Sequence, residues 1–298
     1  MTPGHQFRVN TSKLPDNPYI SYTSGMSSIV IYHHLGLGDH FMCHGIVREY
    51  AKTHTRVGIF TLERNYPSVA FMFRDLKNVD VIKGTDVEAK KYIAEKTVSF
   101  PHHRYDSALI LGFDRLDRNS GELLENQFYA MANIDLSKKW SSFNVDRDPE
   151  AEQRLFSTVA PKKPYVFLHE DIRRSYLIDR KLIDPQYTIV TPDPTLAPNS
   201  FDYCSIIEQA AEIHVIDSSF MFMIDCLPYD ASHQRLVVHR YSRENEDWKL
   251  PTLGKNWKII NIENWHVGFL RYLRRRITEY KGRIRSKLFP IHKSVEIA

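Results

Sequence analysis

The sequence contains no apolar run that approaches the roughly 20 residues needed to cross a membrane. Its N-terminus also lacks the apolar core of a secretory signal peptide. Cysteine is scarce, and Cys43, Cys204 and Cys226 are odd in number and far apart. That pattern argues against a disulfide framework and against a cysteine-rich zinc site. We therefore expect a cytoplasmic protein.

Several catalytic motifs are missing as well. The chain has no Walker loop ending in Gly-Lys-Ser/Thr and no Gly-x-Ser-x-Gly nucleophile elbow. Gly36 and Gly38 do not complete a Gly-x-Gly-x-x-Gly fingerprint, because Phe41 stands where the third glycine would be. These absences disfavour NTP hydrolysis, dinucleotide redox chemistry and nucleophilic catalysis by a serine.

What the sequence does contain is typical of a soluble globular protein with room for two domains. It has 298 residues, of which 42% are hydrophobic and 26% are charged. The net charge of +4 is unevenly placed: residues 271–287 carry eight basic side chains and one acidic one, which is +7 and leaves −3 elsewhere. One C-terminal segment therefore holds the basic character, which suits an anionic partner there better than a nucleic-acid-binding body.

Residues 27–52 predict a strand, a glycine turn and a helix in one continuous run. The β-branched residues 29–31 form the strand. Gly36 and Gly38 then permit backbone angles that are closed to other residues. Asp39 opens the helix as its N-cap. In an open α/β sheet, such a turn at the carboxyl end of a strand is where ligands bind.

The same alternation of strand and helix continues along the chain and begins afresh after residue 163, which predicts two Rossmann-like halves with parallel strands. Strands are expected at 29–31, 56–62, 79–83, 108–111, 165–169, 187–191, 213–217, 235–239 and 257–261. Further helices are expected at 66–76, 87–96, 122–134, 150–159, 203–211, 219–227 and 263–288.

This alternation divides the chain into four parts. They are an irregular lead-in at 1–26, an N-terminal Rossmann-like domain at 27–150, a second Rossmann-like domain at 151–262, and a basic amphipathic helix with its tail at 263–298.

Three stretches carry a family resemblance. They are His34-Leu35-Gly36-Leu37-Gly38-Asp39-His40 after the first strand, His169-Glu170-Asp171 with Arg173, Arg174 and Arg180 after the first strand of the second half, and Ile216-Asp217-Ser218-Ser219 before a helix. With the layout of most of the chain, they resemble the two-domain GT-B glycosyltransferases, and among these the heptosyltransferase-type enzymes that use a nucleotide-linked sugar. The resemblance implies two domains facing across a cleft, with the acceptor bound mainly by the first and the donor nucleotide by the second.

On the first domain, the resemblance places Asp39 where the catalytic base of an inverting enzyme would stand. The alternative is that Asp39 only caps a helix, worth roughly 1 kcal/mol. Histidines cluster around it, and each is an alternative base or hydroxyl ligand, although a packing or surface role is the ordinary one. The site residues expected on this side are Asp39 and His40 for catalysis, with His34, Gly36, Gly38 and His44 for the acceptor.

On the second domain, polar residues that follow apolar strands should emerge at the carboxyl edge of the sheet. Arginines there can bind the oxygens of a diphosphate with forked donors, although a solvated arginine is the common alternative. Ser218 and Ser219 begin a helix whose N–H groups suit a phosphate, and either could simply cap it. The donor-site residues expected are His169, Asp171, Arg173, Arg174, Arg180, Thr191, Asp217, Ser218 and Ser219.

We expect no metal site. His40 and His44 stand four apart on one helix, a spacing that zinc accepts. However, no glutamate follows His40, and no third ligand stands at motif spacing. The resemblance agrees, since GT-B enzymes generally need no metal.

The sequence thus predicts a glycosyltransferase of the hexosyl- or pentosyltransferase class. It would move a sugar from a nucleoside-diphosphate-sugar to a glycan or other hydroxyl acceptor, with inversion and with no cofactor besides the donor. The first alternative is a non-catalytic nucleotide- or glycan-binding module of the same fold, and a third candidate is a sugar-nucleotide epimerase or a phosphorylase.

The basic C-terminal helix has three interpretations. It could pack its aromatic face on the N-terminal domain and leave its arginines solvated. It could lie on an anionic membrane surface, as in glycosyltransferases that act on lipid-linked acceptors, which would make the protein peripheral. It could bind nucleic acid, which is the one partner that we do not expect.

Overall fold

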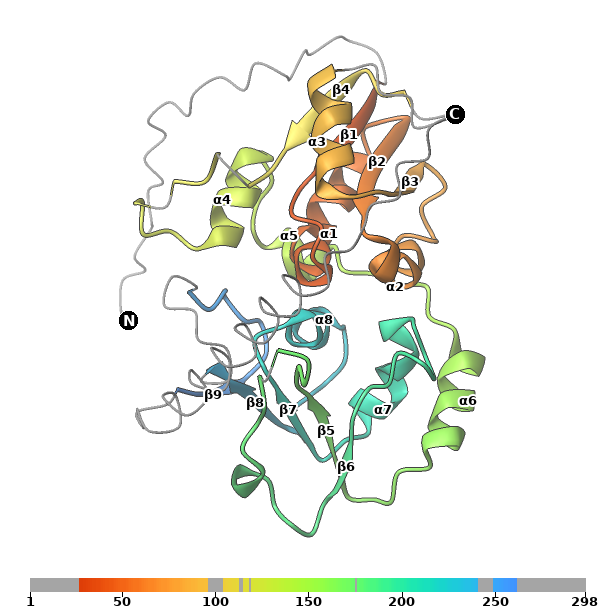
Figure 1. Cartoon of the computed structure of the whole chain (residues 1–298), viewed down its shortest axis with the longest axis vertical. Helices are drawn as coiled ribbons and strands as arrows, with labels where there is room; N and C mark the ends of the chain where they lie inside the picture. The colour runs from red at the N-terminus through yellow and green to blue at the C-terminus, as the bar shows by residue number, and fades with distance from the viewer. Residues whose placement is uncertain are drawn as a thin grey trace, which may run out of the picture.

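A computed structural model of the chain describes residues 27–95, 104–112, 115–117, 119–174, 176–240 and 249–261, which form two α/β domains stacked one on the other (Figure 1). The expected lead-in at 1–26 and the expected basic helix at 263–288 lie outside the described residues. The first domain holds β1 (Ser28–Tyr32), α1 (Leu37–Ala51), β2 (Arg56–Thr61), η1 (Glu63–Asn65), α2 (Tyr66–Met72), β3 (Val79–Lys83), α3 (Asp86–Glu95), β4 (Ser107–Ile110), α4 (Leu124–Met131) and α5 (Lys138–Ser141). The next helix, α6 (Pro149–Val159), packs against the second domain (Figure 1).

The second part is built around five short strands and shorter helices. It holds β5 (Tyr165–His169), η3 (Arg180–Leu182), β6 (Thr188–Val190), η4 (Ser200–Tyr203), α7 (Cys204–Glu208), β7 (Glu212–Val215), α8 (Ser219–Cys226), β8 (Arg235–His239) and β9 (Trp257–Ile260).

Both sheets are parallel throughout the described strands, as the sequence predicts. The first has the order β3-β2-β1-β4 and the second the order β6-β5-β7-β8-β9. In each sheet the order in which successive strands are added reverses once. The reversal lies between β1 and β4 in the first sheet and between β5 and β7 in the second. Open parallel sheets bind ligands outside the carboxyl ends of such strands, so this order already marks where a site should lie.

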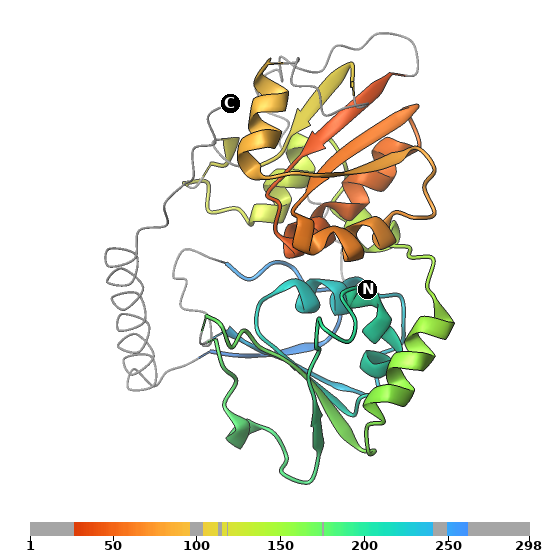
Figure 2. The same cartoon turned by 45° about the vertical axis from the view of Figure 1, so that its right-hand side comes forward.

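Each sheet is buried on both faces because alternate residues of a strand point to opposite sides. On β1, Ile31 belongs to the core under α1, whereas Val30 and Tyr32 pack with Ala89 and Tyr92 of α3. The second sheet follows the same rule, with one face under α7 and α8 and the other under the segment between β5 and β6. Figure 2 shows the helices on the two sides of the first sheet.

The two domains share one hydrophobic core. A single cluster of buried apolar side chains runs from the first sheet through α1 and α8 to the second sheet. Phe201 of η4 carries the contact, since its ring centroid lies 5.6 Å from that of Phe41 and 5.5 Å from that of Phe71. Beside it, the hydroxyl of Ser68 receives the backbone N–H of Ser200 at 2.9 Å. The orientation of the domains is therefore fixed by buried packing.

The nine strands of the described ranges lie at the nine expected positions, whereas several helices differ from the prediction. The helix expected at 203–211 begins earlier as η4, because the Asn199 side chain accepts the N–H of Phe201 and caps it there. The short α5 was not predicted, since four residues give too little periodic pattern. No helix in the described ranges is long and apolar enough to cross a membrane.

The opening glycine turn also differs from the prediction. Gly36, not Asp39, is the N-cap of α1, and Asp39 stands third in the helix with its N–H bonded to the Gly36 carbonyl. Gly36 has φ −67° and ψ 144°, which other residues also adopt. Among the described glycines, left-handed angles occur at Gly112 and Gly121. Gly36 and Gly38 instead leave room for neighbours, as the site geometry shows.

Candidate active site

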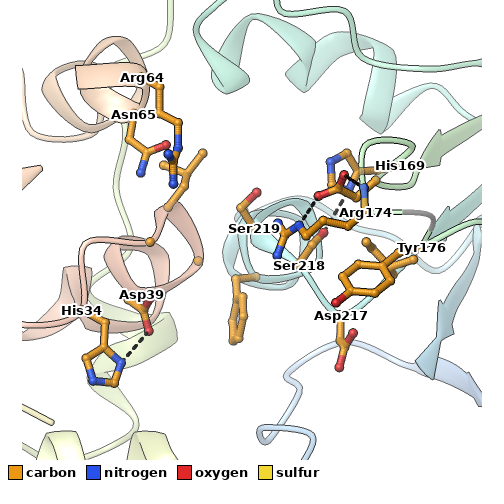
Figure 3. Close-up of a pocket in the computed structure, with 16 residues that line it drawn as sticks. His34, Asp39, Arg64, Asn65, His169, Arg174, Tyr176, Asp217, Ser218 and Ser219 are labelled. Atoms are coloured by element: carbon orange, nitrogen blue, oxygen red, sulfur yellow. Dashed lines mark hydrogen bonds and ion pairs between the residues drawn. The ribbon is translucent and has the colours of Figure 1, made fainter. Parts of the chain in front are cut away.

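A cavity of about 480 Å³ lies between the two domains. It opens where the carboxyl ends of β1, β5 and β7 face each other, and the first turns of α1 and α8 form part of its wall. Its lining residues are His34, Gly36, Leu37, Gly38, Asp39, Arg64 and Asn65 from the first domain, and His169, Asp171, Arg174, Tyr176, Ile216, Asp217, Ser218, Ser219 and Phe222 from the second. Figure 3 shows the two walls facing each other.

On the first-domain wall, Asp39 presents a partly exposed carboxylate. Its side chain is 20% exposed, and Oδ1 lies 3.8 Å from Nδ1 of His34 (Figure 3). His34 is itself held edge-on against Phe128, with ring centroids 5.8 Å apart. A carboxylate in the first turn of a helix is stabilised by the helix dipole, which favours its ionised form. The wall therefore offers a fixed anionic acceptor for a proton.

Two glycines let the surroundings approach Asp39 closely. A Cβ on Gly36 would lie 2.6 Å from Oδ2 of Asp39, so the missing side chain makes room for that carboxylate. A Cβ on Gly38 would lie 3.3 Å from the ring of Phe222, at the contact between α1 and α8. These glycines therefore bring the Asp39 carboxylate and the second domain close to the cavity.

The structure does not place the other predicted histidines of α1 in the cavity wall. His40 is 1% exposed, its two ring nitrogens have no hydrogen-bond partner, and its ring packs edge-on against His33. Burial lowers the pKa of His40 well below its ordinary value, so the ring is neutral. His44 is also buried, against Phe143. Consecutive residues of a helix differ by about 100° in direction, so Asp39 lines the cavity whereas His40 and His44 do not.

On the second-domain wall, His169 ends β5, Ser218 follows the adjacent strand β7, and the two side chains are hydrogen-bonded. Nδ1 of His169 lies 2.8 Å from Oγ of Ser218 (Figure 3). Burial lowers the pKa of His169 to about 4, so its ring is neutral at pH 7. Ser218 stands at the N-cap of α8, but its side chain makes no capping hydrogen bond. Capping is thus not what its hydroxyl does here.

Arg174 is positioned by a tight turn after β5. The backbones of Asp171 and Tyr176 exchange two hydrogen bonds, and the turn between them carries Arg174 to the cavity. Nε of Arg174 donates to Oδ2 of Asp171 at 2.6 Å. Burial alone would raise the pKa of Asp171, but the hydrogen bonds from Arg174 hold it below its ordinary value. The ion pair therefore fixes the guanidinium at the wall.

Asp217 completes this wall. It follows β7, it is 1% exposed, and its Oδ2 lies 3.8 Å from Nε of Arg240. Its position directly before Ser218 places the buried carboxylate at the start of α8.

Three predicted donor-site residues do not line the cavity. Arg180 is bound to Glu170, with Nη2 donating to Oε1 at 2.6 Å, because that carboxylate lies beside it after β5. Arg173 is exposed within the turn that presents Arg174. Thr191 is exposed after β6, which is an edge strand and lies outside the pair β5 and β7 that borders the cavity.

Sequence reasoning also missed residues that the fold brings to the cavity, chiefly Arg64, Asn65, Tyr176 and Phe222. Arg64 and Asn65 follow β2, so the strand-end rule that found His169 could have found them. Phe222 carries no such signal, since it stands one turn inside an apolar helix. Within the described ranges, no group of three or more His, Cys, Asp or Glu side chains could hold a metal ion.

The comparison with solved structures decides the fold. The crystal structure of the glycosyl transferase family 9 protein from Veillonella parvula DSM 2008 matches with a TM-score of 0.50 at 10% identity, covering 81% of this chain and 88% of that one. The chain has the GT-B fold.

Two further solved structures also match. The iron-containing dodecameric glycosyltransferase TibC of enterotoxigenic E. coli H10407 matches at 10% identity and TM-score 0.42, covering 77% of this chain and 64% of that one. The E. coli heptosyltransferase WaaC with ADP-2-deoxy-2-fluoro heptose matches at 12% identity and TM-score 0.41, covering 78% of this chain and 92% of that one. No family model and no curated protein sequence matches this chain.

Proposed function

We propose that this GT-B chain is a glycosyltransferase that moves a sugar from a nucleoside-diphosphate-sugar to a hydroxyl acceptor. One observation carries the proposal: a fixed carboxylate, Asp39, faces Arg174, Ser218 and Ser219 across one cavity between two domains. Group transfer needs a base on the acceptor side and positive charge on the leaving-group side. The two walls of the cavity carry these two chemistries.

In the proposed reaction, the oxygen of the acceptor hydroxyl attacks the anomeric carbon of the donor sugar while Asp39 accepts the proton of that hydroxyl. The bond from that carbon to the donor phosphate breaks, and the nucleoside diphosphate leaves with the electron pair. A single displacement from the face opposite the leaving group inverts the anomeric centre. Asp39 and the α8 N-terminus stand on opposite walls, which suits this geometry.

The donor diphosphate would lie against the start of α8. The first N–H groups of α8 are not capped by the Ser218 side chain, and they form the positive end of the helix dipole. Arg174 adds a guanidinium whose forked donors match phosphate oxygens. In this proposal these groups supply the positive charge that some transferases obtain from a metal ion.

A glycan or lipid-linked molecule is the proposed acceptor, bound by the first-domain wall around His34 and Asp39. The basic segment 271–287 would give the protein contact with an anionic membrane. A binding module of the same fold would use the same donor wall but would not need Asp39, so turnover separates the two functions.

Ligand binding tests the donor wall directly. A ligand that binds only the folded chain raises its melting temperature, by RT ln(1 + [L]/Kd) in free energy. We expect at least one member of a panel of nucleoside diphosphates and nucleotide-sugars to do so, and Arg174→Gln to reduce the shift. The neighbouring variant Arg173→Gln should keep it, because Arg173 does not line the cavity. Equal losses in the two variants would contradict the assigned wall.

Gly36→Ala tests the position of the Asp39 carboxylate. The backbone at Gly36 tolerates alanine, but the new Cβ would meet Oδ2 of Asp39 at 2.6 Å and push the carboxylate aside. A misplacement of about 1 Å costs about 10²-fold in rate, so we expect turnover to fall by about 10- to 100-fold with little change in melting temperature. In an Asp39→Asn background the same substitution should cause no further loss, since the base is already gone. Additive losses would show that Gly36 acts independently of Asp39.

A further inference from the structure

Arg64 is a second arginine of the cavity, and it comes from the opposite domain to Arg174. It stands in η1, directly after β2, and its side chain lines the cavity. Figure 3 shows it on the first-domain side, across the cavity from Ser219, Ser218 and Arg174. Two cations from two domains thus border one space.

The backbone that carries Arg64 is anchored. The side-chain amide of Asn65 donates to the carbonyl of Leu35 at 2.9 Å, which ties η1 to the loop that precedes α1. Asn65 is 8% exposed, so this bond is sheltered from water. A guanidinium on a tethered turn loses less freedom when it binds a ligand than one on a loose loop.

The charge of Arg64 is not neutralised by its surroundings. Its neighbour Glu63 pairs with Lys83 instead, with Nζ donating to Oε1 at 2.7 Å. Arg64 itself is exposed and makes no hydrogen bond or ion pair with the described residues. Arg174, by contrast, is already paired with Asp171. Of the two arginines in the cavity lining, Arg64 therefore has more N–H donors available to bind an anion.

We propose that Arg64 is a ligand of the donor diphosphate, supplied by the acceptor domain. This rests on the proposed function, because it assumes that the diphosphate lies at the start of α8. Negative charge grows on the leaving diphosphate as the sugar bond breaks, and a guanidinium aimed at that charge stabilises the transition state. A diphosphate held by Arg64, Arg174 and the α8 N–H groups would bridge the two domains.

The test measures binding of inorganic pyrophosphate and of ADP, GDP and UDP to the full chain by titration calorimetry. We expect Arg64→Gln to raise the Kd for pyrophosphate, and for whichever nucleotide binds, by about tenfold, since hydrogen bonds to charged groups are the strong ones. Arg64→Lys keeps the positive charge but loses the forked pair of N–H donors, so its affinity should lie between those of the wild type and Arg64→Gln. Arg154→Gln is the matched control, because Arg154 lies on α6 outside the cavity lining and is 68% exposed. Unchanged melting temperatures confirm folding.

The outcomes separate this proposal from the proposed function. Wild-type affinity for pyrophosphate in Arg64→Gln would overturn the assignment, as would a wild-type chain that binds no pyrophosphate. Unchanged diphosphate affinity together with a raised acceptor KM would also overturn it and move Arg64 to the acceptor. A chain that releases no sugar from any donor, yet binds pyrophosphate tenfold more weakly after Arg64→Gln, would remove the transferase activity and leave the Arg64 anion site standing.

Discussion

Asp39→Asn is expected to lower the turnover number of sugar transfer by about 10²- to 10⁴-fold, the usual contribution of a general base. Asparagine keeps the size of the side chain but cannot accept the proton of the acceptor hydroxyl. The affinity for the nucleoside diphosphate should stay near that of the wild type, because Asp39 is not among the groups proposed to hold it, which are Arg64, Arg174 and the first N–H groups of α8. Initial rates and calorimetric titration of the same preparation measure the two quantities.

The folding of this variant is not in question, since Asp39 is partly exposed and is not the cap of α1. Its charge in the first turn contributes at most about 1 kcal/mol through the helix dipole. Asp135→Asn is a matched control, because Asp135 is an exposed aspartate of the same domain outside the cavity lining. Wild-type turnover in Asp39→Asn would exclude this residue as the base and favour His34 beside it.

Asp225→Ala is expected to lower the free energy of unfolding more than any other substitution proposed for this chain. Asp225 is 2% exposed in α8, and one carboxylate receives the indole N–H groups of Trp140 and Trp257, each at 2.9 Å. It also accepts the backbone N–H groups of Gly254 and Lys255. Alanine would leave these four donors without their acceptor inside the interface between the domains.

The loss of its partner costs a buried donor such as that of Trp257 about 1–3 kcal/mol, and each of the three part-buried donors costs less because water can reach it, so we expect the free energy of unfolding to fall by about 3 kcal/mol. That is a large share of the roughly 5–15 kcal/mol that stabilises a typical protein. Urea unfolding followed by tryptophan fluorescence measures it, since Trp140 and Trp257 both report on this site. Asp230→Ala is the control, because Asp230 is exposed and bonds only Ser232 nearby. A loss below about 1 kcal/mol for Asp225→Ala would contradict this assignment.

The strands could be predicted because their physics is local. Short β-branched and aromatic runs followed by polar residues predict buried parallel strands, and each of the nine runs predicted in this way is a strand in the part of the chain that the structure describes. The same rule predicts that His169 and Ser218 emerge at the carboxyl edge of the second sheet, whereas the prediction of Asp39, and of a cleft between the two domains, came from the family resemblance; all three residues line the cavity.

The details of the site could not be predicted because they depend on which partner a side chain meets. Arg180 and Arg174 look alike in the sequence, yet Glu170 holds the first away from the cavity and Asp171 holds the second beside it. His40 and Asp39 are neighbours, but the rotation of the helix buries one and exposes the other.

The interface between the domains is a third case. The bond between Asp225 and Trp140 joins residues 85 positions apart, and no pattern in the sequence links them. The shared core around Phe201 has the same character, since the ring contacts cross from one domain to the other. Such contacts follow from tertiary packing alone, so the sequence predicts two domains without predicting how firmly they are joined.

If the cavity transfers a sugar from a nucleotide-linked donor, the chain should also release the nucleoside diphosphate slowly when water replaces the acceptor. The most direct measurement is the release of nucleoside diphosphate when the full chain is incubated with each member of a panel of nucleotide-sugars, with water as the only acceptor. We expect slow release from at least one donor by the wild type, and release lowered by at least about 10²-fold in Asp39→Asn. No release from any donor, with no change in melting temperature in their presence, would contradict it.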